Sequence, residues 1–197
     1  MKNKFSISAG AILLVSALYF FGGIQIIAEL ALCCAVHELG HFMFLRIFGA
    51  KGNFLRFDAT GFSMSFTGLE GNVKKFVAAS AGPLFGIIFY FISNYLGKIS
   101  VLDFWQGAAM LSLLLSVYNL LPAWPLDGGY IAAIILNRLT SSEKSEKLVA
   151  VSGFLTSIIL MIAGLIMLEN KSGAAFIIAG MWLLTAQTGI VKNFSVM

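Results

Sequence analysis

The chain of 197 residues is 59% hydrophobic and only 11% charged, with a mean hydropathy of +0.91. Soluble domains carry about 25% charged residues, so this composition excludes an ordinary soluble domain. The formal net charge of +4 could indicate an anionic partner, but the distribution of the cations has a simpler explanation, given below. We therefore expect an integral membrane protein.

Apolar segments long enough to cross a bilayer recur along the chain, since a transmembrane helix needs about 20 mostly apolar residues. The predicted spans cover residues 6–23, 24–46, 76–97, 104–122, 148–168 and 174–191. The polar intervals between them leave no room for a second domain. We predict one membrane domain over residues 1–197.

The cations predict the orientation of these spans. If the N-terminus is cytoplasmic, every Lys and Arg except Lys98 and Lys171 lies on the cytoplasmic side, as the positive-inside rule requires. Both termini are then cytoplasmic, and nucleic-acid binding is not needed to explain the charge. Because His37 precedes Arg46 in the second span, it is expected about 13 Å beneath the cytoplasmic surface.

A metal-binding pattern interrupts the second span. His37-Glu38-Leu39-Gly40-His41 fits HExxH, in which two histidines one helical turn apart can reach one Zn²⁺ and the glutamate acts as a general base. These are the chain's only histidines, and ionisable groups inside a bilayer are costly and usually functional. The alternative is two buried structural histidines with Glu38 as their counter-ion.

A catalytic zinc site needs a third protein ligand, and without a further histidine an acidic residue must supply it. The candidates after the motif are Asp58, Glu70, Asp103, Asp127, Glu143, Glu146 and Glu169. Asp127 lies in "NLLPAWPLDGG", whose prolines should break a helix near Pro122 at a depth where irregular backbone is either buried or lines a cavity. We predict Asp127 as the ligand, with a helix N-cap as its alternative role.

Two other polar residues share the second span with the histidines. Cys33, one turn before His37, is on much the same helix face but is expected to pack as a small apolar side chain. Glu29, two turns before His37, has no assigned role.

Two further segments have recognisable patterns. Apolar and polar residues alternate over residues 55–58 and 62–67, which predicts a short β-hairpin with a turn at residues 59–61; the alternative is a surface loop. Small residues gather over residues 78–86 around Pro83, and these are expected to let helices approach closely.

Together, "HELGH", "NLLPAWPLDGG" and the intervening "AGPLFG" resemble the signatures of the site-2 proteases, the intramembrane zinc metalloproteases. The likeness is greatest to the short bacterial branch that includes a sporulation-stage protease processing a pro-sigma factor. The resemblance implies an all-α polytopic membrane protein with about six transmembrane helices and a membrane-associated β-hairpin after the second. It also implies one zinc ion held by His37, His41 and Asp127, with Glu38 as general base and acid.

The resemblance further implies a substrate and its binding residues. Such enzymes hydrolyse a peptide bond in or near a transmembrane segment of a single-span or helical-hairpin membrane protein, often releasing a transcription or sigma factor. Asn119 and Pro122 match the signature around the third ligand, where substrate positioning or transition-state hydrogen bonding is expected. The hairpin matches strands thought to pair with an unwound substrate, which would involve Phe62, Met64 and Phe66.

The expected location is a bacterial cytoplasmic membrane, with the site nearer the cytoplasmic face. The chain has no room for the PDZ or CBS domains of larger relatives. Two other functions stay open from the residues alone. One is a membrane zincin of another clan with a glutamate, such as Glu70, as third ligand. The other is a divalent-metal transporter.

Overall fold

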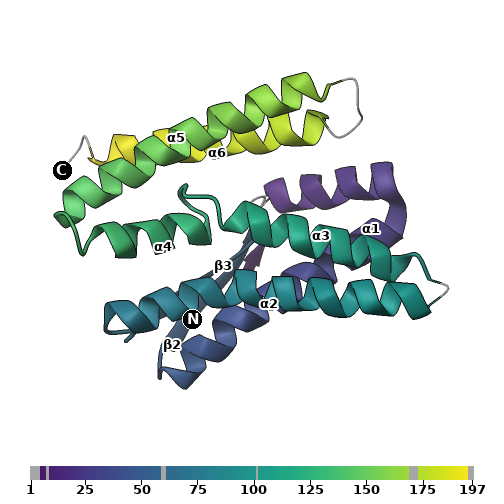
Figure 1. Ribbon diagram of the computed structural model, residues 1–197, viewed down its shortest axis with the longest axis horizontal. Helices are drawn as coiled ribbons and strands as arrows, with labels where there is room; N and C mark the ends of the chain where they lie inside the picture. Colours follow the sequence, from purple (N-terminus) through teal and green to yellow (C-terminus); the bar gives the residue numbers. More distant parts are fainter. Residues whose placement is uncertain (1–4, 8, 59–60, 101, 169–172, 195–197) are drawn as a thin grey trace. The chain divides into compact units, whose positions relative to one another are not determined.

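Helices dominate the chain in a computed structural model that describes residues 5–7, 9–58, 61–100, 102–168 and 173–194 (Figure 1). For residues 5–22, 51–66 and 188–194 the description covers the backbone. The chain divides into two compact units, residues 1–117 and 118–197. The first contains the histidine motif and the second contains Asp127.

The first unit begins with a long helix, α1 (Ala9–Ile47), that is broken at Gly23. Gly23 has φ 67°, a backbone conformation that glycine adopts without a steric cost. The break coincides with the predicted boundary between the first two spans. At the other end, Gly49 (φ 77°) donates its N–H to the carbonyl of Arg46 at 3.0 Å, and Ala50 donates to Leu45 at 2.9 Å. These two bonds form a Schellman motif that ends the helix.

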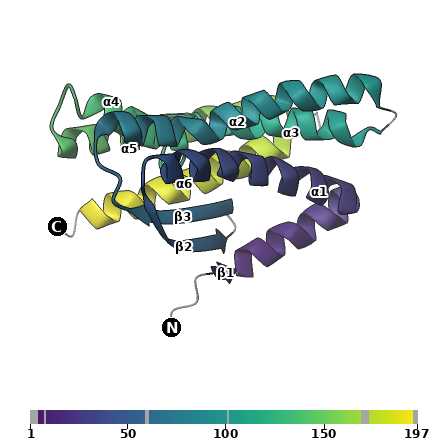
Figure 2. The same ribbon diagram turned by 90° about the horizontal axis from the view of Figure 1, so that it is seen from below.

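The first unit also contains a three-stranded sheet in the order β1-β2-β3, of which β1 precedes α1 and the other two strands follow it (Figure 2). Its strands are β1 (Phe5–Ile7), β2 (Lys51–Asp58) and β3 (Gly61–Thr67). β2 and β3 pair antiparallel, with Leu55 opposite Met64, over the residues whose alternation predicted strands. Residues 59–60 of the predicted turn lie outside the described residues.

The resemblance implied an all-α fold with a two-stranded β-hairpin. The structure instead has a three-stranded sheet, one strand more than the predicted hairpin. β1 runs parallel to β2, with Phe5 opposite Leu55, where the first span was predicted to begin. A strand of three residues is too short to show an alternating pattern.

Small residues bring α2 (Asn72–Ile99) and α3 (Phe104–Asn119) close together. Ser112 Oγ donates to the carbonyl of Gly86 at 2.8 Å, and a Cβ added to Gly86 would overlap Ser116 Oγ. Ala78, Ala81 and Gly82 are also buried. The packing role predicted for residues 78–86 is confirmed, and α2 continues through Pro83.

The second unit consists of α4 (Asp127–Leu136), α5 (Ser142–Ile166) and α6 (Gly173–Phe194). α5 and α6 lie side by side in opposite directions (Figure 1). Glycines mark their contacts: Gly164 packs on Ile177, and Gly153 packs on Gln187. The two helices therefore approach closely along most of their length.

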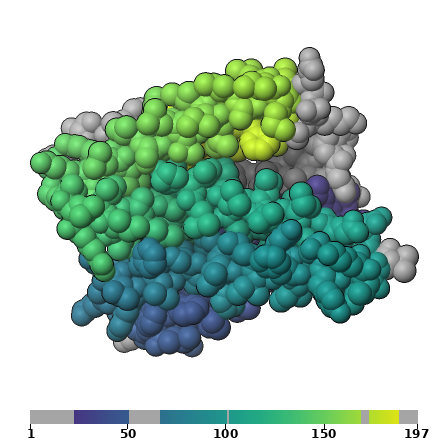
Figure 3. Space-filling model, viewed as in Figure 1, coloured from purple at the N-terminus to yellow at the C-terminus, as the bar shows by residue number. Residues whose placement is uncertain are grey.

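Three helices are long and apolar enough to cross a membrane among the described residues, namely Gly23–Ile47, Asn72–Ile99 and Ser142–Ile166. Both α2 and α5 expose large apolar side chains, among them Phe91 and Tyr95 of α2 and Leu155 and Ile159 of α5. Figure 3 draws the atoms of each of these helices as filled spheres. Exposed apolar surface of this kind suits contact with lipid. The chain is a multi-pass membrane protein.

Six spans remain a prediction. Each predicted span contains helix, but α3 has 16 residues, fewer than the about 20 that a transmembrane helix needs.

Candidate metal centre

The two histidines of the motif lie one turn apart on α1, and their rings meet edge-on with an interplanar angle of 74°. Their Nε2 atoms are 3.2 Å apart and their ring centroids 4.9 Å apart. Two nitrogens at about 2.0 to 2.1 Å from a tetrahedral zinc ion would be about 3.3 Å apart. The spacing of the two Nε2 atoms therefore fits a shared metal ion. His37 is buried and His41 is half-buried.

The ring of His41 is held by the backbone of α2. Its Nδ1–H donates to the carbonyl of Ala78 at 2.8 Å. A carbonyl can only accept, so Nδ1 carries the proton and Nε2 keeps its lone pair in the neutral ring. Hydrogen bonds of this kind fix the tautomer and orientation of metal-binding histidines.

Two glycines allow this close approach. A Cβ added to Gly82 of α2 would overlap His41 Nε2, and one added to Gly40 of α1 would lie 2.6 Å from the carbonyl oxygen of Ala81. The sequence predicted Gly82 as part of a packing segment but missed its contact with the ring of His41. In the sequence, only its place in "AGPLFG" could have indicated that Gly82 lies close to the histidine motif.

Other polar residues of α1 have structural partners. Cys33 is fully buried and its Sγ donates to the carbonyl of Ala108 at 3.2 Å, which agrees with its expected packing role. Glu29 is buried and accepts a hydrogen bond from Gln25 Nε2 at 2.8 Å. Glu38 follows His37 in α1 and is half-buried.

In the second unit, Asp127 lies in the first turn of α4. The N-cap is Leu126, without a side-chain capping bond, so the alternative role of Asp127 as an N-cap is wrong. α3 ends at Asn119, which agrees with a break near Pro122. The connection contains a cis peptide between Trp124 and Pro125.

Two glycines after Asp127 let that connection fold onto α4. A Cβ added to Gly128 would overlap the carbonyl of Leu120, and one added to Gly129 would lie 2.6 Å from the carbonyl oxygen of Ala123. The "DGG" sequence therefore serves backbone packing. It places the Asp127 carboxylate directly after a tightly folded segment.

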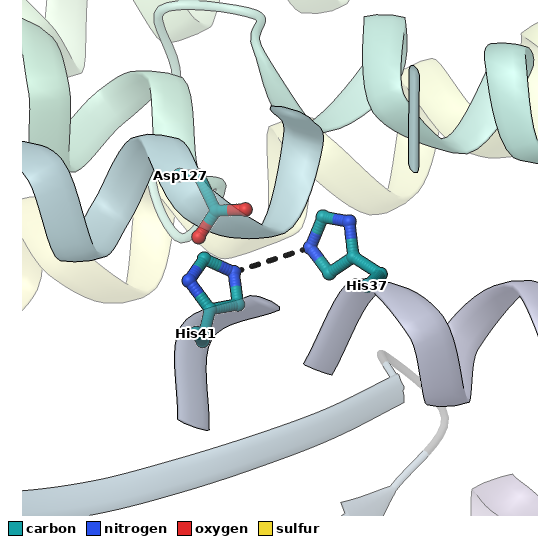
Figure 4. Close-up of side chains that lie close together, drawn as sticks. All are labelled: His37, His41 and Asp127. Carbon is teal, nitrogen blue, oxygen red and sulfur yellow. Dashed lines mark hydrogen bonds between the residues drawn. The ribbon is translucent and has the colours of Figure 1, made fainter. Parts of the chain in front are cut away.

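His37, His41 and Asp127 form the one group of potential metal ligands among the described residues, with their ligand atoms all within 4.8 Å of one another (Figure 4). Two imidazoles and a carboxylate are the three protein ligands that suit catalytic zinc, which keeps a fourth position open. Among the other acidic residues that could have supplied the third ligand, Glu70 is exposed. Glu143 is also exposed, and its Oε1 lies 2.6 Å from Lys147 Nζ. The side chain of Asp58 lies outside the described residues.

The residues predicted to bind substrate are spread over two places. Asn119 is the last residue of α3, and Pro122 is exposed in the following connection. Phe62, Met64 and Phe66 occupy alternate positions of β3. Their side chains lie outside the described residues, and their role stays a prediction.

Comparisons with known sequences found a family model and a curated relative that are similar to parts of this chain. Residues 94–163 match the model of Peptidase family M50, a range that includes Asp127 but not the histidine motif. A zinc metalloprotease of Methanocaldococcus jannaschii is 30% identical over 138 residues, which are 66% of this chain and 40% of the relative. The chain thus spans about two fifths of that relative's length.

The fold has a close counterpart among solved structures. A site-2 protease from Methanocaldococcus jannaschii superimposes with a TM-score of 0.75 at 20% identity, covering 94% of this chain and 89% of that chain. At this identity the likeness concerns the fold.

Proposed function

We propose that the chain is a zinc-dependent intramembrane endopeptidase of the site-2 protease family, supported by the match of residues 94–163 to Peptidase family M50 and by the similarity to a zinc metalloprotease. It hydrolyses a peptide bond in or near a transmembrane segment of another membrane protein. The observation that carries the proposal is the group of His37, His41 and Asp127, whose ligand atoms lie within 4.8 Å of one another. Glu38 adjoins this group on α1.

His37 and His41 would hold the metal through Nε2, and Asp127 through a carboxylate oxygen. When bound, Zn²⁺ supplies Lewis acidity that makes water more acidic and polarises a carbonyl. Glu38 accepts the proton of the attacking water on a carboxylate oxygen and passes it to the leaving amide nitrogen. The Ala78 carbonyl keeps the His41 ring oriented through its 2.8 Å hydrogen bond while this occurs.

The sheet offers a way to hold the substrate. A transmembrane helix must unwind before cleavage, because its carbonyls are shielded in the helical hydrogen-bond ladder. β3 is the last strand in the order β1-β2-β3, so one of its edges is unpaired among the described strands. An extended peptide can add to such an edge through main-chain hydrogen bonds, with Phe62, Met64 and Phe66 on one face and Asn119 and Pro122 near the third ligand.

The proposed setting is a bacterial cytoplasmic membrane, with both termini and the water entry on the cytoplasmic side. The substrate class is single-span or helical-hairpin membrane proteins, and cleavage could release a transcription or sigma factor. The distribution of Lys and Arg supports the orientation. A single domain over residues 1–197 is proposed with it.

Co-expression of the wild type and Glu38→Gln with a panel of tagged single-span bacterial membrane proteins tests the proposal. Glu38→Gln should keep zinc and slow cleavage by about 10²- to 10⁴-fold, the usual contribution of a general base. Glu70→Gln, which changes an exposed carboxylate of the same unit, is the matched control and should cleave normally. Wild-type protein that holds one zinc per chain but shows no Glu38-dependent cleavage would contradict the proposal.

A further inference from the structure

We propose that Gln187 is a positioning residue for Asp127, because its side chain holds the backbone segment that presents this carboxylate. The inference rests on the proposed function, since it takes Asp127 as a metal ligand. All the contacts that support it lie within residues 118–197. Gln187 comes from α6, sixty residues after Asp127 in the chain.

The first observation is the environment of the Gln187 amide. Gln187 is completely buried, and its Nε2 donates to the carbonyl of Trp124. Trp124 precedes Asp127 by three residues. Burying an amide in an apolar helix costs free energy unless the amide is hydrogen-bonded. The bond to the Trp124 carbonyl offsets this cost for Gln187 Nε2. Holding that segment is a function that an apolar side chain could not provide.

The neighbouring helix makes room for this side chain. A Cβ added to Gly153 of α5 would lie 2.6 Å from Gln187 Cδ. One turn before Gln187, the completely buried Leu183 belongs to the same hydrophobic cluster as Ala123 and Leu126. One face of α6 therefore supports the segment through apolar packing and through a directed hydrogen bond.

A second hydrogen bond reaches the same segment from α5. Ser152 Oγ lies 2.5 Å from the carbonyl oxygen of Pro122 and 2.9 Å from that of Val149, so its single proton can be donated to either. Pro122 and Trp124 thus have partners on two different helices. The Trp124 ring also packs edge-on against Tyr130 of α4, with centroids 4.5 Å apart.

Displacement of this segment would be transmitted to Asp127. The segment packs directly against the first turn of α4 at Gly128 and Gly129, and Leu126 donates its N–H to the carbonyl of Ala123 at 2.9 Å. With so little free space, a shift at Trp124 must move the turn that begins with Asp127. Gln187 would therefore act on the metal through Asp127, as residues behind a metal ligand commonly do.

Gln187→Met tests this, because methionine has a similar length but cannot donate to the Trp124 carbonyl. The purified full chain is titrated with Co²⁺ alone, and the absorption bands of bound Co²⁺ report ligand geometry. We expect Gln187→Met to weaken Co²⁺ binding by about 10- to 100-fold and to alter the band shape. Ser157→Ala is the matched control, since Ser157 is equally buried but donates within its own helix to Gly153 at 2.8 Å.

The outcomes separate this inference from the proposed function. Loss of the Co²⁺ spectrum in Asp127→Ala, with a weakened and altered spectrum in Gln187→Met and a normal one in Ser157→Ala, supports both. An unchanged spectrum and affinity in Gln187→Met overturns the positioning role and leaves the metal site intact. An unchanged spectrum in Asp127→Ala overturns both.

A second variant keeps the test decisive if Gln187→Met does not fold. Ser152→Ala removes the other side-chain bond to the segment from a half-buried position. It should weaken Co²⁺ binding by about 2- to 10-fold, the range for one neutral hydrogen bond. Wild-type affinity in Ser152→Ala, where Gln187→Met is unfolded, would count against a segment held by these side chains.

Discussion

The imidazole of His41 donates a 2.8 Å hydrogen bond from Nδ1 to the carbonyl of Ala78, while its Nε2 faces His37 Nε2 at 3.2 Å. Helix α2 therefore sets the ring of a residue that belongs to α1. One turn further along α2, Gly82 contacts the same ring so closely that any Cβ would overlap Nε2. A segment without ionisable groups is thus part of the proposed metal centre.

Gly82→Ala should abolish tight zinc binding. The added methyl group would push the His41 ring away from His37, and we expect zinc affinity to fall by about 100-fold. Zinc content of the purified protein and competition with a chelating dye measure this. Gly86→Ala is the matched control on the same helix, because its Cβ would overlap Ser116 Oγ instead. Gly86→Ala should lower thermal stability and keep zinc; equal zinc binding in both variants would contradict the role of Gly82.

Zinc should stabilise the folded chain through the two histidines. A ligand that binds only the folded state at 100 times its Kd adds about 2.7 kcal/mol to the free energy of unfolding. Removing zinc with a chelator should therefore lower the Tm of the wild type, and adding zinc back should restore it. His41→Ala should show a Tm that does not respond to zinc. A zinc-dependent Tm in His41→Ala would place the ion elsewhere.

Much of the fold could be predicted from apolar length and period. The boundary at residues 23 and 24 coincides with the Gly23 break, and the alternation around Leu55 and Met64 marks the two paired strands. Strand β1 was missed because Phe5–Ile7 is three residues long and its partner, β2, is distant in sequence. A pairing between distant segments leaves no local pattern that could reveal it.

The sequence predicted the three residues that lie close enough to form a possible metal site, but not the residues that pack around them. His37 and His41 are the chain's only histidines and have the HExxH spacing, and Asp127 was distinguished from the other acidic residues by the prolines that precede it. Gly82 and Gln187 are not unusual as single residues. Their roles depend on contacts between helices, with the His41 ring and with the Trp124 carbonyl, and no spacing rule within one helix predicts those contacts.

The position of β3 as the last strand in the order β1-β2-β3 predicts a specific defect in substrate use. Changing Phe62, Met64 and Phe66 together to alanine should remove contacts on one face of the strand. A loss of about 1.4 kcal/mol in substrate binding would raise KM about tenfold, with zinc content unchanged. The control is Ser63→Ala with Ser65→Ala on the opposite face of β3. A fall in kcat or zinc content with KM unchanged would argue against a substrate-binding strand.

Gly128 offers the sharpest test of how the third ligand is placed, because the glycine adjoins Asp127 without being a ligand. A Cβ at this position would overlap the carbonyl of Leu120, so Gly128→Ala must move either the connection after α3 or the first turn of α4. In both cases the carboxylate of Asp127 is displaced, and zinc affinity should fall by about 10-fold or more.

Gly164→Ala is the control in the same unit, since its Cβ would lie 2.6 Å from Ile177 Cγ1 at the other end of α5. Gly164→Ala should destabilise the packing of α5 on α6 and leave zinc affinity unchanged. Zinc affinity measured at a temperature where both variants are folded decides the question, and a normal value in Gly128→Ala would mean that Asp127 does not depend on this turn.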